Sequence, residues 1–333
     1  MKLPRIAITM GDPSGVGPEI CLHALASAEL AGLCVPVVFG DAAVLRECAA
    51  KLRLPFAAQV IAPADVAGDF ANITRPTVLD LGVIEPDAFT PGVISAATGH
   101  AGYTYVNRAI DAALAGHVAA VSTAPLNKEA MHLAGIRFPG HTEIFAERTS
   151  AERSCMMQYS EEITCTFVTV HVGYAEVPAL LTKERILEVI ELTAEGLARI
   201  RRHRPKLAVL GLNPHAGEHG LFGDREEERI IIPAIEEARA RGHDVEGPLP
   251  PDTAFLPWKR KATDAFVCMY HDQGHIPVKA LAFDSAVNTT LGLPIIRTSV
   301  DHGTALDIAW QGKADTGSLF AAVRLAVRLA KGR

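Results

Sequence analysis

Three histidines, each following an apolar segment and preceding small or polar residues, are the strongest chemical signal in this 333-residue chain. His171 follows Thr-Phe-Val-Thr-Val, His215 follows Val-Leu-Gly-Leu-Asn-Pro, and His271 follows Phe-Val-Cys-Met-Tyr. In α/β proteins, ligands bind at the carboxyl ends of the strands. Three imidazoles delivered by three strands can hold one divalent cation and leave a coordination position for substrate. The pattern predicts a metal-dependent enzyme.

The type of cation stays open at this point. Neutral imidazoles suit Zn, Co, Ni or Fe, whereas Mg prefers oxygen ligands. Asp272, beside His271, and Asp252, in Gly-Pro-Leu-Pro-Pro-Asp-Thr, are candidate metal neighbours or proton acceptors. A helix cap is the alternative role for Asp252. Lys128, in Thr-Ala-Pro-Leu-Asn-Lys, is either a further acid/base group or a surface lysine.

A second set of residues has the chemistry of an anion site. The segment Pro-Gly-His-Thr-Glu at 139–143 supplies an imidazole, a hydroxyl and the amides of a helix N-terminus. Downstream, basic and amide side chains stand among apolar residues, where an unpaired buried charge is costly. A substrate phosphate or carboxylate would pair with them, and internal salt bridges are the alternative. The candidate substrate-binding residues are His141, Thr142, Lys279, Asn288 and Arg297.

Two glycine-bearing segments could approach a ligand with their backbone. Residues Gly11–Glu19 follow a strand but lack the third glycine of a dinucleotide fingerprint, so no Rossmann cofactor site is expected there. That segment is either a strand-to-helix turn or a ligand-facing loop. Residues Ser299–Ala309 allow close approach of a flat ligand such as adenine, or form the turn that starts a helix.

Bulk properties narrow the class of protein. The chain is 49% hydrophobic and 21% charged, which suits a globular protein of about two domains. Its net charge of -6 argues against a nucleic-acid surface. We expect no membrane span and no signal peptide. The six cysteines show no CxxC spacing, so we expect them to be reduced thiols. These features predict a cytoplasmic protein whose partner is a small molecule.

Apolar strands alternate with helical periodicity along the chain, which predicts an α/β protein with a mainly parallel sheet covered on both faces. The strands are expected at Arg5–Thr9, Val35–Gly40, Ala119–Ser122, Cys165–His171, Leu207–Leu212 and Ala265–Tyr270. The helices are expected at Pro18–Ala28, Ala96–Ala115, Lys183–His203, Glu226–Arg241 and Ser318–Lys331. Because no linker interrupts the middle, the chain is expected to leave one domain and return to it.

Long motifs in this sequence resemble the 4-hydroxythreonine-4-phosphate dehydrogenase (PdxA) family over nearly the whole chain. They are far more specific than a single short motif. The matching stretches are Gly-Asp-Pro-Ser-Gly-Val-Gly-Pro-Glu at 11–19, Gly-His-Thr-Glu at 140–143, Gly-Leu-Asn-Pro-His-Ala-Gly-Glu at 211–218, Tyr-His-Asp-Gln-Gly at 270–274, and 288–305.

The resemblance implies roles for individual residues. It puts the metal ligands at His171, His215 and His271 and the substrate contacts at His141, Thr142, Lys279, Asn288 and Arg297. The cation would be Zn, Co or Mg. Residues 302–309 are also similar to the His-Gly-Ser-Ala-Pro-Asp-Ile-Ala stretch of isopropylmalate and isocitrate dehydrogenases, which lines the adenosine half of NAD. This similarity implies that Gly303, Thr304 and Ala305 bind NAD, with NADP as the alternative.

The resemblance also implies the two-domain architecture of those dehydrogenases, with a cleft between domains. Residues 1–145 and 298–333 would form the first domain, on the cofactor side. Residues 146–297 would form the second, on the metal and dimer side. A homodimer would complete each site across its interface.

Two departures bear on the substrate. Members that make vitamin B6 usually have Leu-Pro-Leu after the first histidine, whereas this chain has Val172-Gly173-Tyr174. After Gly274 it reads His-Ile-Pro-Val-Lys, where many of those members have Leu-Pro-Val-Leu-Lys. These changes look more like the branch that acts on 4-phospho-D-threonate or 4-phospho-D-erythronate. A branch that oxidises the cis-dihydrodiol of terephthalate stays open as an alternative.

The expected reaction is oxidation of a secondary alcohol near a carboxylate in a small 4-phosphorylated hydroxy acid, with NAD and a divalent cation. The substrate would be 4-phosphohydroxy-L-threonine, 4-phospho-D-threonate or 4-phospho-D-erythronate, and the β-keto acid product would lose CO2. A metal-dependent hydrolase is the rival from another class, and a non-catalytic anion-binding relative is a third hypothesis.

Overall fold

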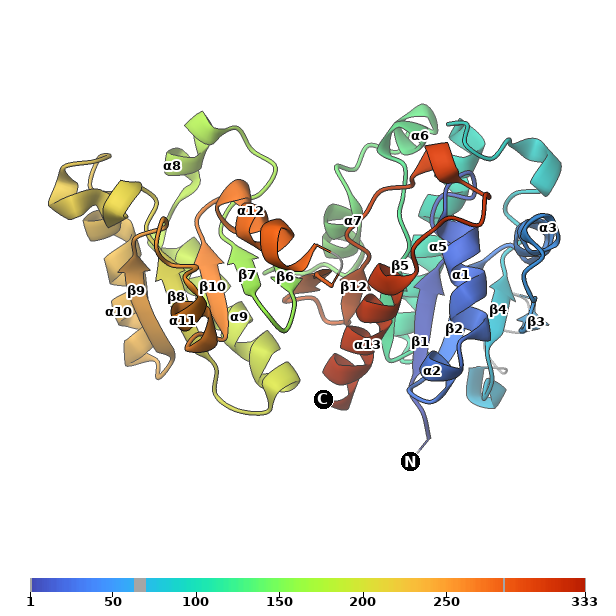
Figure 1. Ribbon diagram of the computed structural model, residues 1–333, viewed down its shortest axis with the longest axis horizontal. Coiled ribbons are helices and arrows are strands. Elements are labelled where there is room, and N and C mark those ends of the chain that lie inside the picture. The colour runs from blue at the N-terminus through green and yellow to red at the C-terminus, as the bar shows by residue number, and fades with distance from the viewer. Residues whose placement is uncertain (1, 63–69, 284, 333) are drawn as a thin grey trace. The chain divides into compact units, whose positions relative to one another are not determined.

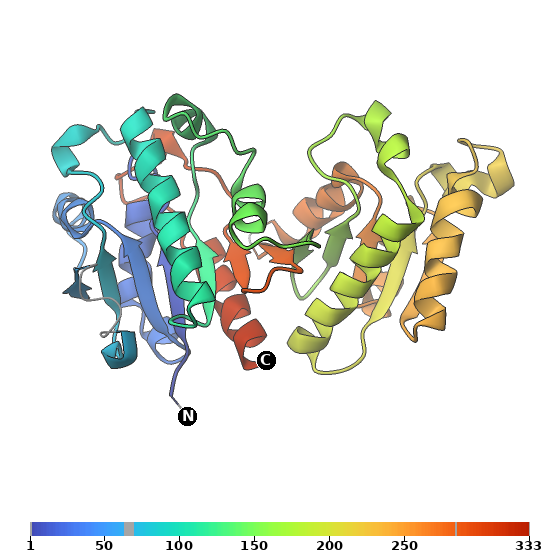
Figure 2. The same cartoon turned by 180° about the vertical axis from the view of Figure 1, so that it is seen from behind.

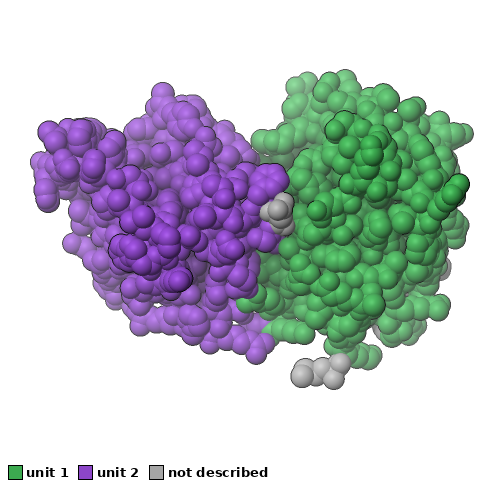
Figure 3. All heavy atoms as spheres, in the orientation of Figure 1, with its two compact units in different colours: residues 1–151, 293–331 green, residues 152–292, 332–333 purple. Residues whose placement is uncertain are grey.

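The computed structural model describes residues 2–62, 70–283 and 285–332. The chain divides into two compact units, which Figure 3 colours separately. Unit 1 comprises Met1–Ala151 and Leu293–Lys331, and unit 2 comprises Glu152–Gly292 with Gly332–Arg333. The chain therefore builds most of unit 1, then unit 2, and returns to unit 1.

Unit 1 is built on a parallel sheet. Its strand order is β3-β4-β2-β1-β5-β12, and every pair of neighbouring strands is parallel. Its middle strands are buried along their length, as expected for a sheet covered on both faces. The strands are β1 (Arg5–Thr9), β2 (Val35–Gly40), β3 (Gln59–Ile61), β4 (Thr77–Asp80), β5 (Ala120–Thr123) and β12 (Arg297–Ser299).

Helices cover both faces of the unit 1 sheet. Figure 1 shows α1 and α13 in front of it, and Figure 2 shows α5 in front from the opposite side. The helices are α1 (Gly17–Ala26), α2 (Ala28–Ala31), α3 (Ala42–Leu52), α5 (Ala96–Leu114), α6 (Lys128–Leu133), α7 (His141–Arg148) and α13 (Gly317–Lys331). Short 3-10 turns are η2 (Phe70–Asn72), η3 (Pro86–Ala88) and η7 (Leu306–Ile308).

The sheet of unit 2 is mixed, with the order β11-β6-β7-β10-β8-β9. The β7, β10, β8 and β9 strands run parallel, whereas β6 is antiparallel to both β11 and β7. The strands are β6 (Cys155–Tyr159), β7 (Thr164–Phe167), β8 (Lys206–Leu210), β9 (Asp244–Leu249), β10 (Ala265–Cys268) and β11 (Val287–Leu291).

The unit 2 sheet is also covered on both faces, by α9 and α10 on one side and α12 on the other (Figures 1 and 2). The α12 side forms a core that includes Phe167, Phe266 and Val278. The helices are α8 (Val177–Leu180), α9 (Lys183–Arg201), α10 (Ile232–Ala240), α11 (Pro257–Lys261) and α12 (His271–Ala282). The turns are η4 (Tyr174–Glu176), η5 (Pro214–Gly220) and the π-turn η6 (Glu227–Ile231).

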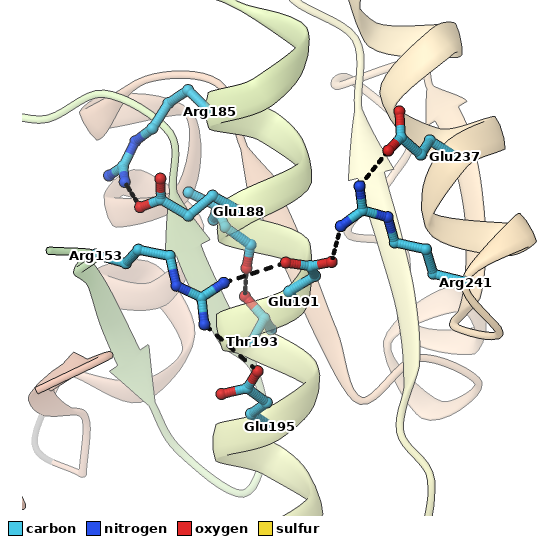
Figure 4. A network of polar contacts seen from close by, with 9 residues as sticks. Arg153, Arg185, Glu188, Glu191, Thr193, Glu195, Glu237 and Arg241 are labelled. Atoms are coloured by element: carbon cyan, nitrogen blue, oxygen red, sulfur yellow. Dashed lines mark hydrogen bonds and ion pairs between the residues drawn. The ribbon is translucent and has the colours of Figure 1, made fainter. Parts of the chain in front are cut away.

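Helix α9 carries a surface network of ion pairs, drawn in Figure 4. Glu191 pairs with Arg153 at 3.2 Å and with Arg241 at 2.7 Å, and Arg241 also pairs with Glu237. Exposed pairs of this kind contribute little to stability. Apolar packing against the sheet therefore holds α9 in place.

The predicted class, a mainly parallel α/β fold, is confirmed. The predicted domain division differs from the observed units by a few residues at each crossing. Residues 146–151 lie in unit 1, where α7 contacts α5. Residues 293–297 also lie in unit 1, because β12 pairs with β5.

Several predicted strands end earlier than expected. The β7, β8 and β10 strands stop at Phe167, Leu210 and Cys268, so all three histidines lie in the segments beyond them. The predicted helix at 226–241 begins as a π-turn and continues as α10. Among the described residues, no helix is long and apolar enough to cross a membrane. All six cysteines are free and buried.

The first testable prediction concerns the packing of α12 on the sheet. A Cβ atom at Gly274 would lie 2.7 Å from Phe167 Cε1 and 2.8 Å from Cys268 Sγ, both buried. Gly274→Ala should therefore lower the free energy of unfolding by about 1–3 kcal/mol, measured by denaturant titration. Gly32→Ala, where the nearest contact is 3.4 Å, is the control and should change stability by less than about 0.5 kcal/mol. Equal stability of the two variants would contradict the packing argument.

Candidate functional site

The three predicted metal histidines follow three neighbouring parallel strands of unit 2. His171 follows β7, His271 follows β10 and His215 follows β8, and these strands are adjacent in the order β7-β10-β8. Parallel strands end at the same edge of the sheet. The expectation that all three histidines occupy one edge is therefore met by the topology.

Two of these imidazoles lie close together. The ring centroids of His171 and His271 are 5.7 Å apart, with the planes tilted by 41°. Both rings line a pocket of about 260 Å³ together with Tyr174, Tyr270 and Asp272. His171 has a left-handed backbone (φ 52°), a conformation that is strained for a non-glycine residue. The pocket has the composition of a cation or substrate site.

The ring of His271 is oriented by Asp272. Its Nδ1 lies 2.6 Å from Asp272 Oδ1, and Tyr174 donates its hydroxyl proton to Asp272 Oδ2 at 2.5 Å. The Tyr174 hydrogen bond, followed by that of His271, lowers the pKa of Asp272, which is therefore ionised and acts only as an acceptor. Nδ1 must then carry the proton, and Nε2 is the nitrogen that can bind a cation.

His275 supports the face of the same ring. Its imidazole stacks on His271 with centroids 3.8 Å apart and planes 10° apart, and on Phe167 at 4.4 Å. His275 Nδ1 lies 3.0 Å from the backbone oxygen of His271, one helical turn earlier. His271 is thus held at its edge by a carboxylate and at its face by a buried ring.

His215 lies in a different setting, the turn η5. Residues His215–His219 all have left-handed backbone angles. The buried carboxylate of Glu227 anchors the start of this turn, because its Oε1 accepts hydrogen bonds from the amides of Leu212 (2.9 Å) and Asn213 (2.8 Å). His215 Nδ1 lies 3.9 Å from Glu218 Oε1.

A divalent cation needs several ligand side chains that converge on one point. Within residues 2–62, 70–283 and 285–332, no group of three or more His, Cys, Asp and Glu side chains is arranged to hold a metal ion. The structure brings His171 and His271 together but does not add His215 to that pair. The pair itself fits a cation, since His271 presents an oriented nitrogen toward a pocket that it shares with His171.

Unit 1 contains a buried cation. Arg297, on β12, is 3% exposed and donates from Nη2 to Thr123 Oγ1 at 3.3 Å. Its guanidinium lies 5.7 Å from the centre of the Phe145 ring. Burial lowers the pKa of Arg297 to about 9, opposed by the charge of Glu143, so the side chain stays protonated at neutral pH. The predicted burial of this arginine is confirmed.

His141 lies beside Arg297. Its Nε2 is shielded from solvent and has no hydrogen-bond partner among the residues that the structure describes. Burial, then the charges of Arg297 and Lys128, hold the pKa of His141 well below its usual 6.5. A neutral imidazole, a guanidinium and an ammonium group therefore gather near the start of α7. This cluster suits an anion such as a phosphate or carboxylate.

The other predicted substrate residues have varied surroundings. Thr142 is half-buried in the first turn of α7, and Asn288 is half-buried on β11. The expectation that Lys279 is buried is wrong: it is exposed on α12, with its Nζ 5.4 Å from the Phe283 ring centre. Its segment is helical, so Val278 faces the core while the next residue faces outward.

The predicted acid/base residues also differ in position. Asp272 lies in the pocket, with both oxygens accepting hydrogen bonds. Lys128 is exposed at the first position of α6, after the cap residue Asn127. Asp252 is exposed in a turn that follows β9.

The glycine-bearing segments of unit 1 pack against each other. Residues 10–20 are buried throughout, and the amide of Val16 donates to the Thr304 oxygen at 3.0 Å. A Cβ on Gly15 would lie 2.7 Å from that oxygen. The N-terminal segment is therefore a structural turn. Within the predicted cofactor segment, Thr304 is buried, Gly303 has open space beside it, and Ala305 has a left-handed backbone (φ 44°).

Three residues that orient these groups were not predicted from the sequence: Tyr174, His275 and Glu227. The spacing of His275 from His271, four residues within one helix, was an available signal. Tyr174 and Glu227 act across long sequence separations and had no local signal.

Fold and site together define a two-unit α/β protein with mainly parallel sheets. One unit has a histidine pocket at its strand ends, and the other has a buried arginine beside a neutral histidine. The profile of the family described as pyridoxal phosphate biosynthetic protein PdxA matches residues 32–326. The chain belongs to this family, which the sequence motifs had indicated.

Relatives match over the full length. The D-threonate 4-phosphate dehydrogenase of Salmonella typhimurium is 45% identical, covering 99% of this chain and 100% of the relative. The 4-hydroxythreonine-4-phosphate dehydrogenase of Desulforapulum autotrophicum is also 45% identical, covering 97% and 94%.

Solved structures agree with this relationship. A 4-hydroxythreonine-4-phosphate dehydrogenase from Klebsiella pneumoniae has a TM-score of 0.86 at 44% identity, covering 98% of both chains. A terephthalate 1,2-cis-dihydrodiol dehydrogenase from Burkholderia xenovorans has a TM-score of 0.70 at 31% identity, again covering 98% of both. A β-decarboxylating dehydrogenase from Thermococcus kodakarensis, 15% identical with a TM-score of 0.51, covering 96% and 82%, shares the fold.

A pH-dependent stability is predicted from His141. Because its pKa is depressed in the folded state, the unfolded chain binds more protons below the usual pKa of 6.5, and stability should fall as pH drops through that value. When the pH is lowered from about 7.5 to about 5.5, the free energy of unfolding should fall in both proteins. The fall should be about 1.4 kcal/mol smaller in His141→Gln, which has no imidazole at this position. Denaturant titrations at both pH values measure the difference. The exposed His100→Gln serves as control, and identical pH profiles for His141→Gln and wild type would refute the assignment.

Proposed function

We propose that this protein is a metal- and NAD-dependent dehydrogenase that oxidises the secondary alcohol of a small 4-phosphorylated hydroxy acid. The observation that carries the proposal is the 45% identity, over 99% of this chain, to a D-threonate 4-phosphate dehydrogenase. The buried cationic cluster of unit 1 supports a phosphorylated substrate. The proposed substrates are 4-phospho-D-threonate, 4-phospho-D-erythronate and 4-phosphohydroxy-L-threonine.

The proposed ligands of the divalent cation are His171, His215 and His271. When bound, the cation would lower the pKa of the substrate hydroxyl, while NAD would accept hydride from the same carbon. Asp272 keeps the Nδ1 proton on His271 and so directs its other nitrogen into the pocket. The candidate acceptors of the hydroxyl proton are Asp272 and Asp252, and Lys128 is a candidate for a further acid/base group.

In unit 1, Arg297 and His141 bind the phosphate, with the hydroxyl and amide of Thr142 as further donors. A phosphate would pair the buried guanidinium and supply an acceptor for the His141 ring nitrogen. Fixing the phosphate fixes the carbon that loses hydride. Lys279 and Asn288 are proposed as further substrate contacts, and Gly303, Thr304 and Ala305 as contacts of the adenosine half of NAD. In the β-keto acid product, the bond between the α-carbon and the carboxylate then breaks and CO2 leaves. The electron pair of that bond forms an enolate, which takes up a proton to give the ketone.

We also propose a homodimer in which two chains contribute to each metal site. Support comes from unit 2, which carries most of the exposed large hydrophobic side chains among the described residues. These are Val172, Tyr174, Leu180, Leu221, Phe222, Leu256, Trp258, Ile276, Leu281 and Phe283. Several flank the histidine pocket or lie on α12, the helix that begins at His271. Burying such side chains against a second copy would be favourable.

The proposed activity is tested by incubating the purified protein with NAD, a divalent cation and each substrate, and following NADH absorbance. We expect reduction with at least one phosphorylated hydroxy acid, and Arg297→Ala should raise its KM by about tenfold to a hundredfold because a charge-assisted contact is lost. Arg148→Ala, an exposed arginine of α7, is the control. An unchanged KM in Arg297→Ala would contradict the phosphate assignment.

The same assay separates the alternatives. Turnover only of terephthalate cis-dihydrodiol would place the chain with that relative. Metal-dependent phosphate release without NADH would indicate a hydrolase. Binding without turnover would indicate a non-catalytic relative.

The shared site is tested with mixed dimers of His215→Ala and His271→Ala. Each variant alone should be inactive. If His215 and His271 of one site come from different chains, a mixed dimer has one site with both histidines intact and regains activity. If both come from the same chain, every site lacks one ligand and the mixture stays inactive. Activity of dimers refolded or co-expressed from the two variants, compared with each variant alone, is the measurement.

A further inference from the structure

The phenol of Tyr174 makes a contact that links two separate segments of unit 2. Its hydroxyl donates to Asp272 Oδ2 at 2.5 Å across 98 positions of sequence. The side chain is 67% exposed, yet its ring also meets the edge of Tyr270, with centroids 5.9 Å apart and planes at 86°. An exposed tyrosine held at both ring and hydroxyl has a defined position.

The turn that carries Tyr174 is fixed by its own hydrogen bonds. The amide of Gly173 donates to Glu176 Oε2 at 2.9 Å, and the amide of Glu176 donates to the Gly173 oxygen at 3.0 Å. Val177, the next residue, is 2% exposed and anchors the turn in the core. These contacts therefore fix the backbone that carries the side chain of Tyr174.

Asp272 links the fixed hydroxyl of Tyr174 to the ring of His271. Its Oδ2 accepts from Tyr174, and its Oδ1 lies 2.6 Å from His271 Nδ1. A carboxylate that is 43% exposed and held at one oxygen only could rotate into solvent. With both oxygens occupied, its plane is set, and the imidazole plane is set with it.

The same contact adds a link between the segments that carry the two histidines. His171 lies three residues before Tyr174, and His271 directly precedes Asp272. The Tyr174–Asp272 hydrogen bond therefore ties the segment after β7 to the start of α12. Backbone hydrogen bonds that continue beyond the ends of β7 and β10 also join these segments, and the rings of His171 and His271 lie 5.7 Å apart.

We propose that Tyr174 is a positioning residue for the metal site: through Asp272, its hydroxyl orients His271 and holds it beside His171 before any cation binds. This inference rests on the proposed function, since the two imidazoles are proposed ligands of the cation. In this proposal, Tyr174 does not contact the cation.

The test uses the full-length protein and the variant Tyr174→Phe, which keeps the ring and removes the hydroxyl. Co2+ alone is titrated into the metal-free protein and followed by its visible absorption and by calorimetry. We expect Tyr174→Phe to bind Co2+ about tenfold more weakly, as is typical when a group that orients a ligand is lost. Tyr159→Phe is the matched control, because it removes a tyrosine–carboxylate hydrogen bond (2.8 Å to Glu161) on β6 of the same unit. It should bind Co2+ as the wild type does.

A double variant separates positioning from a general effect. Because Tyr174 is proposed to act through Asp272, Tyr174→Phe should have little further effect on Co2+ affinity in an Asp272→Asn background. Crystals of metal-free Tyr174→Phe supply a second measurement, in which the His271 ring should leave its observed orientation or occupy more than one.

Unchanged Co2+ affinity in Tyr174→Phe, an unchanged His271 ring in its crystals, or fully additive losses in the double variant would each overturn the proposal. A wild-type protein that binds no Co2+ would instead refute the metal site of the proposed function. In that case the ring positions in the metal-free crystals would still decide the role of Tyr174.

Discussion

The parallel pairing of β7, β10 and β8 is the constraint on which the histidine pocket depends. Each parallel strand must be followed by a crossover, so the segments that leave these strands all start at one edge of the sheet. His171, His271 and His215 each occupy the first residues of such a segment. His171 and His271 thus lie close together, and His215 follows a strand of the same edge, although long stretches of chain separate the three.

Backbone strain concentrates in the same segments. His171 and residues 215–219 have left-handed angles, which cost free energy for side chains with a Cβ. The hydrogen bonds that Glu227 accepts at the start of the η5 turn offset part of this cost. A histidine held in such a conformation keeps little freedom to relax, which favours a preorganised site over one that forms on binding.

In unit 1, burial lowers the pKa of both Arg297 and His141. Arg297 is buried against Phe145 and Thr123, where its charge is less screened than at the surface. The neighbouring His141 stays neutral because burial and nearby cations disfavour its protonation. The charge of Glu143 favours the protonated form of Arg297 and so opposes the effect of burial on its pKa. The lysine on α12, by contrast, keeps its charge in solvent.

Local patterns in the sequence determined the class of fold, the identity of the chemical groups and the edge of the sheet where the histidines lie. Apolar runs mark buried parallel strands, and polar residues directly after them mark the carboxyl ends. The burial of Arg297 could be predicted because it follows the apolar run Ile295-Ile296 and lies on a strand of the sheet. The burial expected for Lys279 was wrong, because helical periodicity turns adjacent residues in different directions.

Only the tertiary structure decided which groups meet. The contact of Tyr174 with Asp272, the stack of His275 on Phe167, and the hydrogen bond from the Asn213 amide to Glu227 all join residues from different segments. Hydrogen bonds and ring contacts extend only a few ångströms, so they depend on how helices and turns settle on the sheet. Spacing along the chain does not encode that packing, because each of these side chains is compatible with many local structures.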